Sequence, residues 1–164
     1  DAFLSYSNED RDWVERELIP NMESRSPAVR LCLHQRDFDV GKTILENVVE
    51  SIEQSRACLI VLSEHYVESE WCMFEAQVAH QSFLDDRREG VVIAVLDEIP
   101  AKRINKTMKM LLKTRTYIEW SLQQANEADE NLEQKYFWKR LKAALHVNDE
   151  NDDNSSKGSK DSMV

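Results

Sequence analysis

Two uninterrupted apolar runs, Ala57–Leu62 and Val91–Leu96, constrain the fold of this chain more than any other feature. Each run is too short for a typical helix. Such runs are typical of central strands in a parallel sheet, because helices cover both faces of that sheet. Three further segments, Ala2–Tyr6, Val29–Leu33 and Thr116–Ile118, are predicted to be the remaining strands.

Helical patterns separate these predicted strands. Ser7 and Ser69 precede two of the patterns and are predicted to cap their first turns. The apolar residues that recur at helical spacing are Val14, Leu18 and Met22; Ile44, Leu45, Val48, Val49 and Ile52; Trp71, Cys72, Phe74, Val78, Ala79 and Phe83; and Phe137, Trp138, Leu141, Ala144 and Leu145. The alternation predicts an α/β fold, a doubly wound, five-stranded parallel sheet flanked by helices, because each right-handed crossover lays a helix on one face.

The predicted fold also indicates where a partner would bind. Open parallel sheets place their sites in loops beyond the carboxyl ends of the strands. The polar segment His34–Lys42 follows the second predicted strand and contains Gly41, one of only three glycines. We predict that this segment is a loop at that edge of the sheet.

Composition limits the size and the class of the protein. The chain has 164 residues, 41% of them hydrophobic, which is enough for one domain. We assign residues 1–146 to this domain and interpret residues 147–164, which are acidic and polar, as a disordered tail. A formal net charge of -10 argues against a nucleic-acid binder, since phosphate contacts need a cationic face. No apolar run reaches the ~20 residues of a membrane span.

One basic segment departs from this acidic balance. It runs from Lys102 to Arg115 without an acid, and such a segment is either a solvated face or a contact for an acidic partner or an anionic membrane. The three cysteines are scattered and predicted to be reduced thiols. The four histidines are also far apart, so we expect no metal site and interpret each histidine as a surface or end-of-element residue.

Three segments resemble the boxes of the TIR (Toll/interleukin-1 receptor) domain family. Asp1–Ser7, with Phe3 and Tyr6, resembles the first box, and Leu31–Gly41 resembles the second, which includes the docking loop called BB. The pair Phe137 and Trp138 resembles the third box. These box residues are expected to be mainly structural, and the implied fold is the flavodoxin-like TIR fold.

Further segments match the same family in the right order. Ser69–Glu75, which contains Trp71, resembles its third helix, and Val61–Ser63 resembles the segment before that helix. Thr116–Trp120 resembles the last strand of Toll-like receptors. The resemblance covers residues 1–146 and is closer to Toll-like receptor tails than to cytosolic adaptors.

The resemblance implies a signalling function through assembly. TIR domains of receptors form homo- or heterodimers and recruit cytosolic TIR adaptors in innate immune and inflammatory signalling. It also implies a place on the cytoplasmic side of a plasma or endosomal membrane, as part of a single-pass receptor. The chain begins at Asp1, inside a predicted strand and without methionine, which suggests a piece of a longer protein that holds the anchor.

The docking loop has the side chains that this role requires. Arg36 and Asp37 supply opposite charges, Phe38 supplies an apolar anchor, and Gly41 permits a bend. The alternative is that Arg36 and Asp37 pair with each other and that Phe38 tucks into the sheet. The implied docking residues are Arg36, Asp37, Phe38, Asp39, Val40 and Gly41. Val40 stands where receptors usually have proline, so this loop lacks one source of stiffness.

Glu75 suggests a competing function. Some TIR domains hydrolyse NAD with a glutamate at the matching position of the third helix, so Glu75 is a candidate catalytic residue. The alternative is a carboxylate at the edge of the apolar stripe that pairs with an arginine, a lysine or a backbone N–H, and we favour this one. Ser7 also stands where NAD-cleaving relatives often carry a basic residue. We therefore expect no cofactor, and NAD would be a substrate only under the enzymatic alternative.

Overall fold

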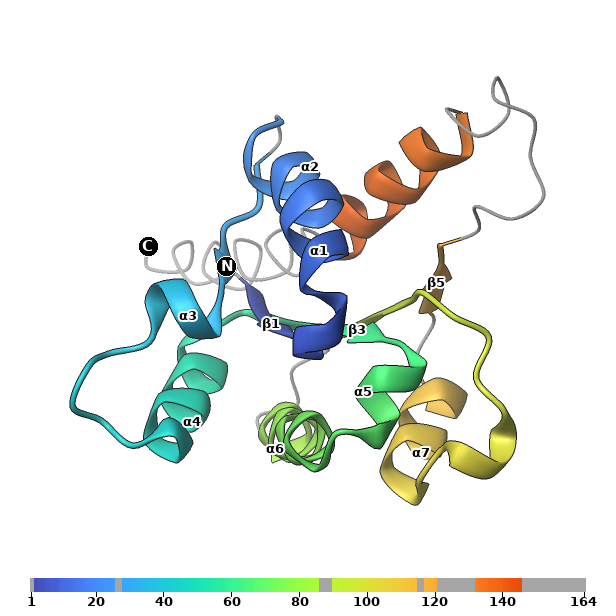
Figure 1. The fold of residues 1–164 in the computed structure, drawn as a ribbon. Coiled ribbons are helices and arrows are strands. Elements are labelled where there is room, and N and C mark those ends of the chain that lie inside the picture. The colour runs from blue at the N-terminus through green and yellow to red at the C-terminus, as the bar shows by residue number, and fades with distance from the viewer. Residues whose placement is uncertain (1, 26–27, 86–89, 115–116, 121–131, 146–164) are drawn as a thin grey trace, which may run out of the picture.

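Figure 1 shows the computed structural model, in which one parallel sheet runs through the middle of the molecule. The structure describes residues 2–25, 28–85, 90–114, 117–120 and 132–145. The strands are β1 (Ala2–Ser5), β2 (Leu31–Cys32), β3 (Ala57–Leu62), β4 (Val91–Val95) and β5 (Tyr117–Glu119), in the order β2-β1-β3-β4-β5. Every strand pair is parallel, which confirms the predicted α/β fold.

The strand predictions are most accurate at the centre of the sheet. β3 spans the predicted residues without change, and all of them are buried. The edge strand β2 is shorter than predicted, because only Leu31 and Cys32 pair with β1. Val29, which was predicted to belong to this strand, is buried and donates its N–H to the carbonyl oxygen of Met22 at 2.8 Å. An edge strand has a partner on one side only, so fewer ladder bonds hold its ends.

The first helical segment changes its winding along its length. It consists of a 3-10 turn η1 (Asn8–Asp10), α1 (Arg11–Trp13), a π-helical turn η2 (Val14–Leu18) and α2 (Ile19–Glu23). The wide turn directly precedes α2, whose first turn contains Pro20, a residue without an N–H to donate. Ser7 caps the segment as predicted, because its Oγ accepts the Glu9 N–H at 3.3 Å. The Asp10 carboxylate in the same turn accepts a hydrogen bond from Ser63.

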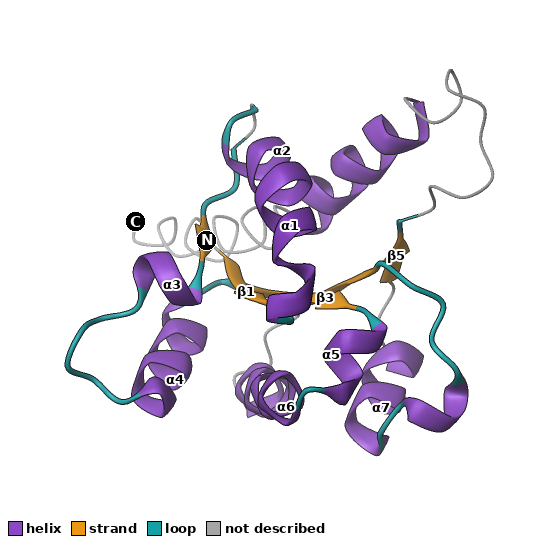
Figure 2. Ribbon diagram, viewed as in Figure 1, coloured by secondary structure: helices purple, strands orange, loops and turns teal. Residues whose placement is uncertain are grey.

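This segment and the helix over residues 132–145 cover one face of the sheet (Figure 2). The predicted apolar stripe of the first helical segment, Val14, Leu18 and Met22, is fully buried there. Phe137 and Trp138 of the last helix are only 5% and 8% exposed. The prediction that this pair belongs to the core is therefore confirmed.

The opposite face is covered by α4 (Ile44–Gln54), α5 (Glu64–Glu68), α6 (Glu70–Asp85) and α7 (Lys106–Thr114). Ser69 caps α6 as predicted, because its Oγ accepts the Cys72 N–H at 3.2 Å. The predicted stripe on α4 is correct for Val48 and Ile52, which are fully buried.

The same stripe is wrong for the first turn of α4, where Ile44 and Leu45 are 62% and 51% exposed. This turn continues directly from the long loop at the margin of the molecule, so the core does not cover it (Figure 1).

None of the helices within the described residues is both long and apolar enough to cross a membrane. The three cysteines, all in the described part of the chain, are free, and burial raises the pKa of Cys72 to about 11. The predicted tail, 147–164, and the end of the basic segment at Arg115 lie outside the described residues.

Candidate functional site

The segment that follows β2 begins as a helical turn. α3 spans His34–Asp37, whereas the whole of His34–Lys42 was predicted as a loop. The Asp37 carboxylate closes the turn, because its Oδ2 accepts the Leu33 N–H at 2.9 Å. The Asp37 N–H in turn donates to the Leu33 carbonyl oxygen at 2.9 Å. The predicted loop therefore starts only after this turn.

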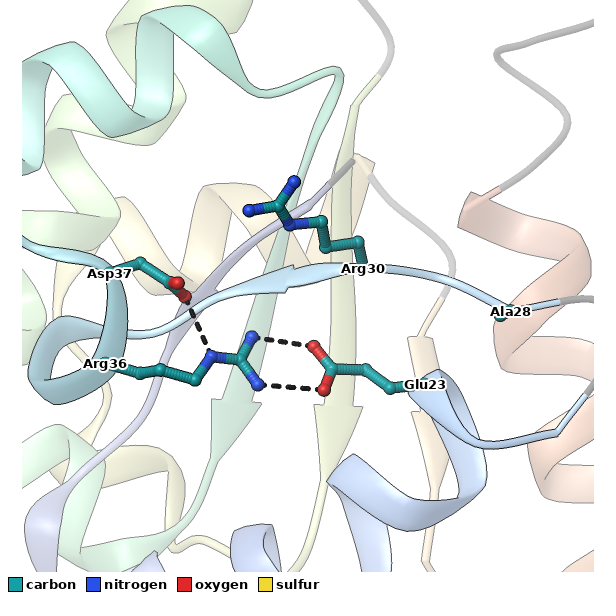
Figure 3. Close-up of a pocket in the computed structure, with 5 residues that line it drawn as sticks. All are labelled: Glu23, Ala28, Arg30, Arg36 and Asp37. Atoms are coloured by element: carbon teal, nitrogen blue, oxygen red, sulfur yellow. Dashed lines mark hydrogen bonds and ion pairs between the residues drawn. The ribbon is translucent and has the colours of Figure 1, made fainter.

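Arg36 ties the turn to the first helical segment. Its guanidinium donates to both oxygens of Glu23, at 2.8 and 2.7 Å (Figure 3). The guanidinium donates as well to the Leu31 carbonyl oxygen at 2.5 Å. It also lies 3.2 Å from Asp37 Oδ2, as the alternative interpretation expected. Arg36 therefore has a structural role at its position, and its further role in docking stays a prediction.

These side chains line a surface hollow of about 360 Å³, together with Ala28 and Arg30 (Figure 3). The hydrogen bonds from Arg36 lower the pKa of Glu23 below its usual value of 4.5. The charge pair in the hollow therefore persists through the neutral range and into mild acid.

Arg36→Ala should lower the free energy of unfolding by about 1–2 kcal/mol near neutral pH, because a bidentate pair and a backbone bond are lost. The pKa of Glu23 is lower in the folded state than in the unfolded state. The pair with Arg36 therefore stabilises the fold above about pH 4.5, and this stabilisation is lost as pH falls through the lowered pKa. Urea unfolding of parent and variant from pH 7 to 3 measures this difference. Arg11→Ala, which breaks the exposed pair with Glu15, is the control and should leave the free energy of unfolding nearly unchanged. A difference between parent and Arg36→Ala that stayed constant with pH would contradict the assignment.

Phe38 is closer to the alternative interpretation, in which it packs into the domain, and its role in docking stays a prediction. Its ring is half-buried and packs against the core, with its centroid 4.9 Å from that of His34. Val40 is fully exposed instead, and Ile44 and Leu45 add two more exposed apolar side chains a few residues later. We call the exposed residues Val40, Ile44 and Leu45 the docking patch, because docking is the role predicted for this loop. The apolar surface of the loop therefore lies at its tip and at the start of α4.

Short-range hydrogen bonds hold the remainder of the loop. The Asn47 side chain accepts the Asp39 N–H at 2.8 Å and donates to the Asp39 carbonyl oxygen at 3.1 Å. Lys42 pairs with the Asp39 carboxylate at 2.9 Å, and the Thr43 side chain caps α4 in a capping box. Gly41 has a φ of 93°, which confirms the predicted bend. The loop therefore has a defined shape even though Val40 replaces the usual proline.

The favoured interpretation placed Glu75 at the edge of the apolar stripe and gave it a lysine, an arginine or a backbone N–H as partner. Both the predicted position and the predicted partner are wrong. Its side chain is fully buried. Oε2 accepts the Ser5 hydroxyl at 2.5 Å, and Oε1 accepts the Trp71 indole N–H at 2.7 Å. The carboxylate thus links α6 to β1 inside the core.

A third group approaches Glu75 from the loop. His34 Nε2 lies 2.7 Å from Glu75 Oε1, although this contact lacks the directed geometry of a hydrogen bond. The His34 ring also packs near the rings of Phe3, Tyr6 and Phe38, at centroid distances of 5.6, 6.2 and 4.9 Å. Histidine spacing alone missed this residue, but its place at the carboxyl end of a parallel strand was an available signal.

The remaining box residues support this centre. Phe3 is fully buried and Tyr6 packs against the core. Trp71 is 39% exposed and is therefore the member of the Glu75 cluster most open to solvent. Below the carboxylate, the Tyr66 hydroxyl lies 2.8 Å from Ser5 Oγ and donates to the Cys72 carbonyl oxygen at 3.0 Å. The Ser5 and Tyr66 hydroxyls therefore both have hydrogen-bond partners in this part of the core.

Comparisons with known proteins agree on one family. A family model described as TIR domain matches residues 1–164. Toll-like receptor 2 type-2 of Gallus gallus is 41% identical over 148 residues, which are 88% of this chain and 18% of that receptor. Toll-like receptor 2 of Mus musculus is 36% identical over the same shares. The chain thus spans under a fifth of the length of these receptors.

Solved structures agree in fold. The TIR domain of the Toll-related receptor TRR-2 from Hydra magnipapillata superimposes with a TM-score of 0.64 at 20% identity, covering 88% of this chain and 97% of that one. A TIR-STING receptor from C. gigas gives a TM-score of 0.56 at 26% identity, over 81% of this chain and 38% of that one. The resemblance drawn from the sequence boxes is confirmed.

Proposed function

The chain belongs to the TIR domain family, and from that premise we propose that it is the intracellular signalling domain of a Toll-like receptor. In this function it docks other TIR domains, which are a second receptor tail and then a cytosolic adaptor. Similarity to Toll-like receptor 2 of several vertebrates supports the receptor assignment. The membrane anchor would belong to the remainder of such a receptor, and this domain would lie on the cytoplasmic side.

The observation that carries the proposal is an apolar tip on a loop of defined shape. Val40 is fully exposed, while Arg36, Asp37 and Asn47 hold the backbone on either side of it. Exposed apolar clusters on a soluble domain mark interaction sites. A loop that is already ordered also loses less conformational entropy on binding. The docking patch therefore suits contact with another folded domain.

Val40→Glu should weaken binding to a second TIR domain by about tenfold or more, because it places a charge where an apolar contact forms. Binding is measured by biolayer interferometry between purified domains, with an immobilised receptor or adaptor TIR domain. The melting temperature should stay within about 2 °C, because Val40 contributes nothing to the core.

Leu132→Glu is the matched control, because Leu132 is also an exposed apolar residue, at 53%, but lies on the last helix. It should bind like the parent. If Val40→Glu bound equally well, docking would lie elsewhere, with the exposed lysines of α7 as the next surface to test.

The enzymatic alternative has weaker support in the geometry. Glu75 is fully buried, and Ser5, Trp71 and His34 occupy both carboxylate oxygens, so a substrate has no access to it in this arrangement. We expect the purified domain at high concentration to leave NAD intact, as followed by chromatography of nicotinamide. Release by the parent, together with no release by a folded Glu75→Ala variant, would contradict this expectation.

A further inference from the structure

We propose that the contact between Glu75 and His34 positions the docking loop, so that Glu75 is a positioning residue for TIR docking. This inference rests on the proposed docking function and names the group in the core that controls the loop. The contact joins α6 to the first residue of α3, over a distance of 2.7 Å between Oε1 and Nε2. The docking patch begins six residues after His34, at Val40.

The side chains around the Glu75 carboxylate determine which group it pairs with. Glu75 is fully buried, and among the described residues His34 is the one basic side chain within ion-pair distance of its carboxylate. The other groups that face the carboxylate, Ser5 and Trp71, are neutral donors. The contact brings the imidazole within 2.7 Å of a fully buried carboxylate, where little water screens the interaction between the two groups. Loss of His34 would leave the buried Glu75 carboxylate with only the neutral donors Ser5 and Trp71.

The ring of His34 transmits this attachment to the loop. Phe38, the first residue after α3, packs on that ring at 4.9 Å, and Phe38 lies two residues before Val40. The other attachments of the loop act elsewhere. Arg36 holds the outer side of α3 through Glu23, and Asn47 holds the backbone at Asp39. Among the described contacts of the loop, those of His34 with Glu75 and with Phe38 join the loop to the interior of the domain.

The same carboxylate oxygen has a second partner at the surface. Trp71 donates its indole N–H to Oε1, which is also the oxygen nearest to His34, and the Trp71 side chain is 39% exposed. A single buried atom therefore lies between the loop and the exposed part of α6.

Two substitutions test the proposal with small changes in shape. Glu75→Gln keeps the side-chain length and its acceptor oxygen but removes the charge. His34→Phe keeps a ring for the packing on Phe38 but removes Nε2. Each should speed hydrogen exchange of the Asp37 and Asp39 amides about tenfold and weaken TIR binding about fivefold or more. The strand β3 should keep the exchange rates of the parent.

The double variant decides whether the two residues act together. Its binding should be no weaker than that of the more affected single variant, because one shared contact is lost only once. Additive losses, or faster exchange in β3 along with the loop, would overturn the proposal in favour of general destabilisation. If Glu75→Gln failed to fold, His34→Phe alone would carry the comparison of loop and strand exchange.

Val40→Glu separates this inference from the proposed function. If Val40→Glu abolished binding while Glu75→Gln and His34→Phe left both binding and loop exchange unchanged, the positioning role would be wrong and docking through the loop would stand. If Val40→Glu bound like the parent, docking through the loop would fail. Loop exchange in the two core variants would then still report whether the contact holds the loop.

Discussion

Trp138→Ala should lower the free energy of unfolding by about 3–5 kcal/mol, the cost of removing a buried aromatic side chain. Trp138 is only 8% exposed, and its ring lies 5.3 Å from that of Trp120 and 6.0 Å from that of Trp13. The substitution would therefore empty the centre of an aromatic cluster that joins the last helix to the first helical segment. Phe137→Ala should have a similar effect, since its ring is 4.9 Å from those of both Trp120 and Trp138.

The neighbouring Tyr136 supplies the control, because it lies on the same helix with 57% of its surface exposed. Tyr136→Ala should change the stability by no more than about 0.5 kcal/mol. Urea denaturation followed by circular dichroism measures all three variants. A Trp138→Ala variant that kept the parent midpoint yet failed to bind other TIR domains would show that this residue docks partners instead of filling the core.

Gly90→Ala should cost about 3 kcal/mol, near the upper end for adding a methyl group to a packed interior. A Cβ at Gly90 would lie 2.5 Å from a ring carbon of Phe83 and 2.7 Å from the carbonyl oxygen of Arg56. The carbonyl is backbone and moves only with the chain around it. Gly90 also accepts the Cys58 N–H at 2.6 Å, so a shift there would disturb the pairing of β3 with β4.

Gly41→Ala is the matched comparison, because a Cβ there would meet nothing within 4 Å. Its cost should come only from the positive φ of 93° and amount to about 1 kcal/mol. Thermal and urea unfolding of the two variants measure the difference. Equal costs at the two glycines would mean that the chain at Gly90 relaxes more easily than its packing indicates.

The docking loop is held by contacts on two sides, and its tip at Val40 is exposed. Arg36, Asp37 and Asn47 fix the loop backbone, and His34 fixes its inner side against Glu75. If the loop docks partners as we propose, a surface that needs little rearrangement loses less entropy on binding.

The sequence alone determined the features that depend on neighbouring residues. The apolar run Ala57–Leu62 predicted the central strand to the residue, because both faces of that strand are covered wherever it pairs. The stripe that includes Phe137 and Trp138 predicted a core helix, because its period follows from helix geometry alone. The family also followed from local segments, namely the boxes around β1, the docking loop and the last helix.

Only the tertiary structure decided which distant side chains meet. Glu75 finds Ser5 and His34, which are 70 and 41 residues away in the sequence, and neither distance carries a periodic signal. Arg36 pairs with Glu23 for the same reason, across the end of the sheet. The exposure of Val40 depends on where the loop leaves the core. Such contacts follow from strand order and loop path, which the spacing of residues along the chain does not specify.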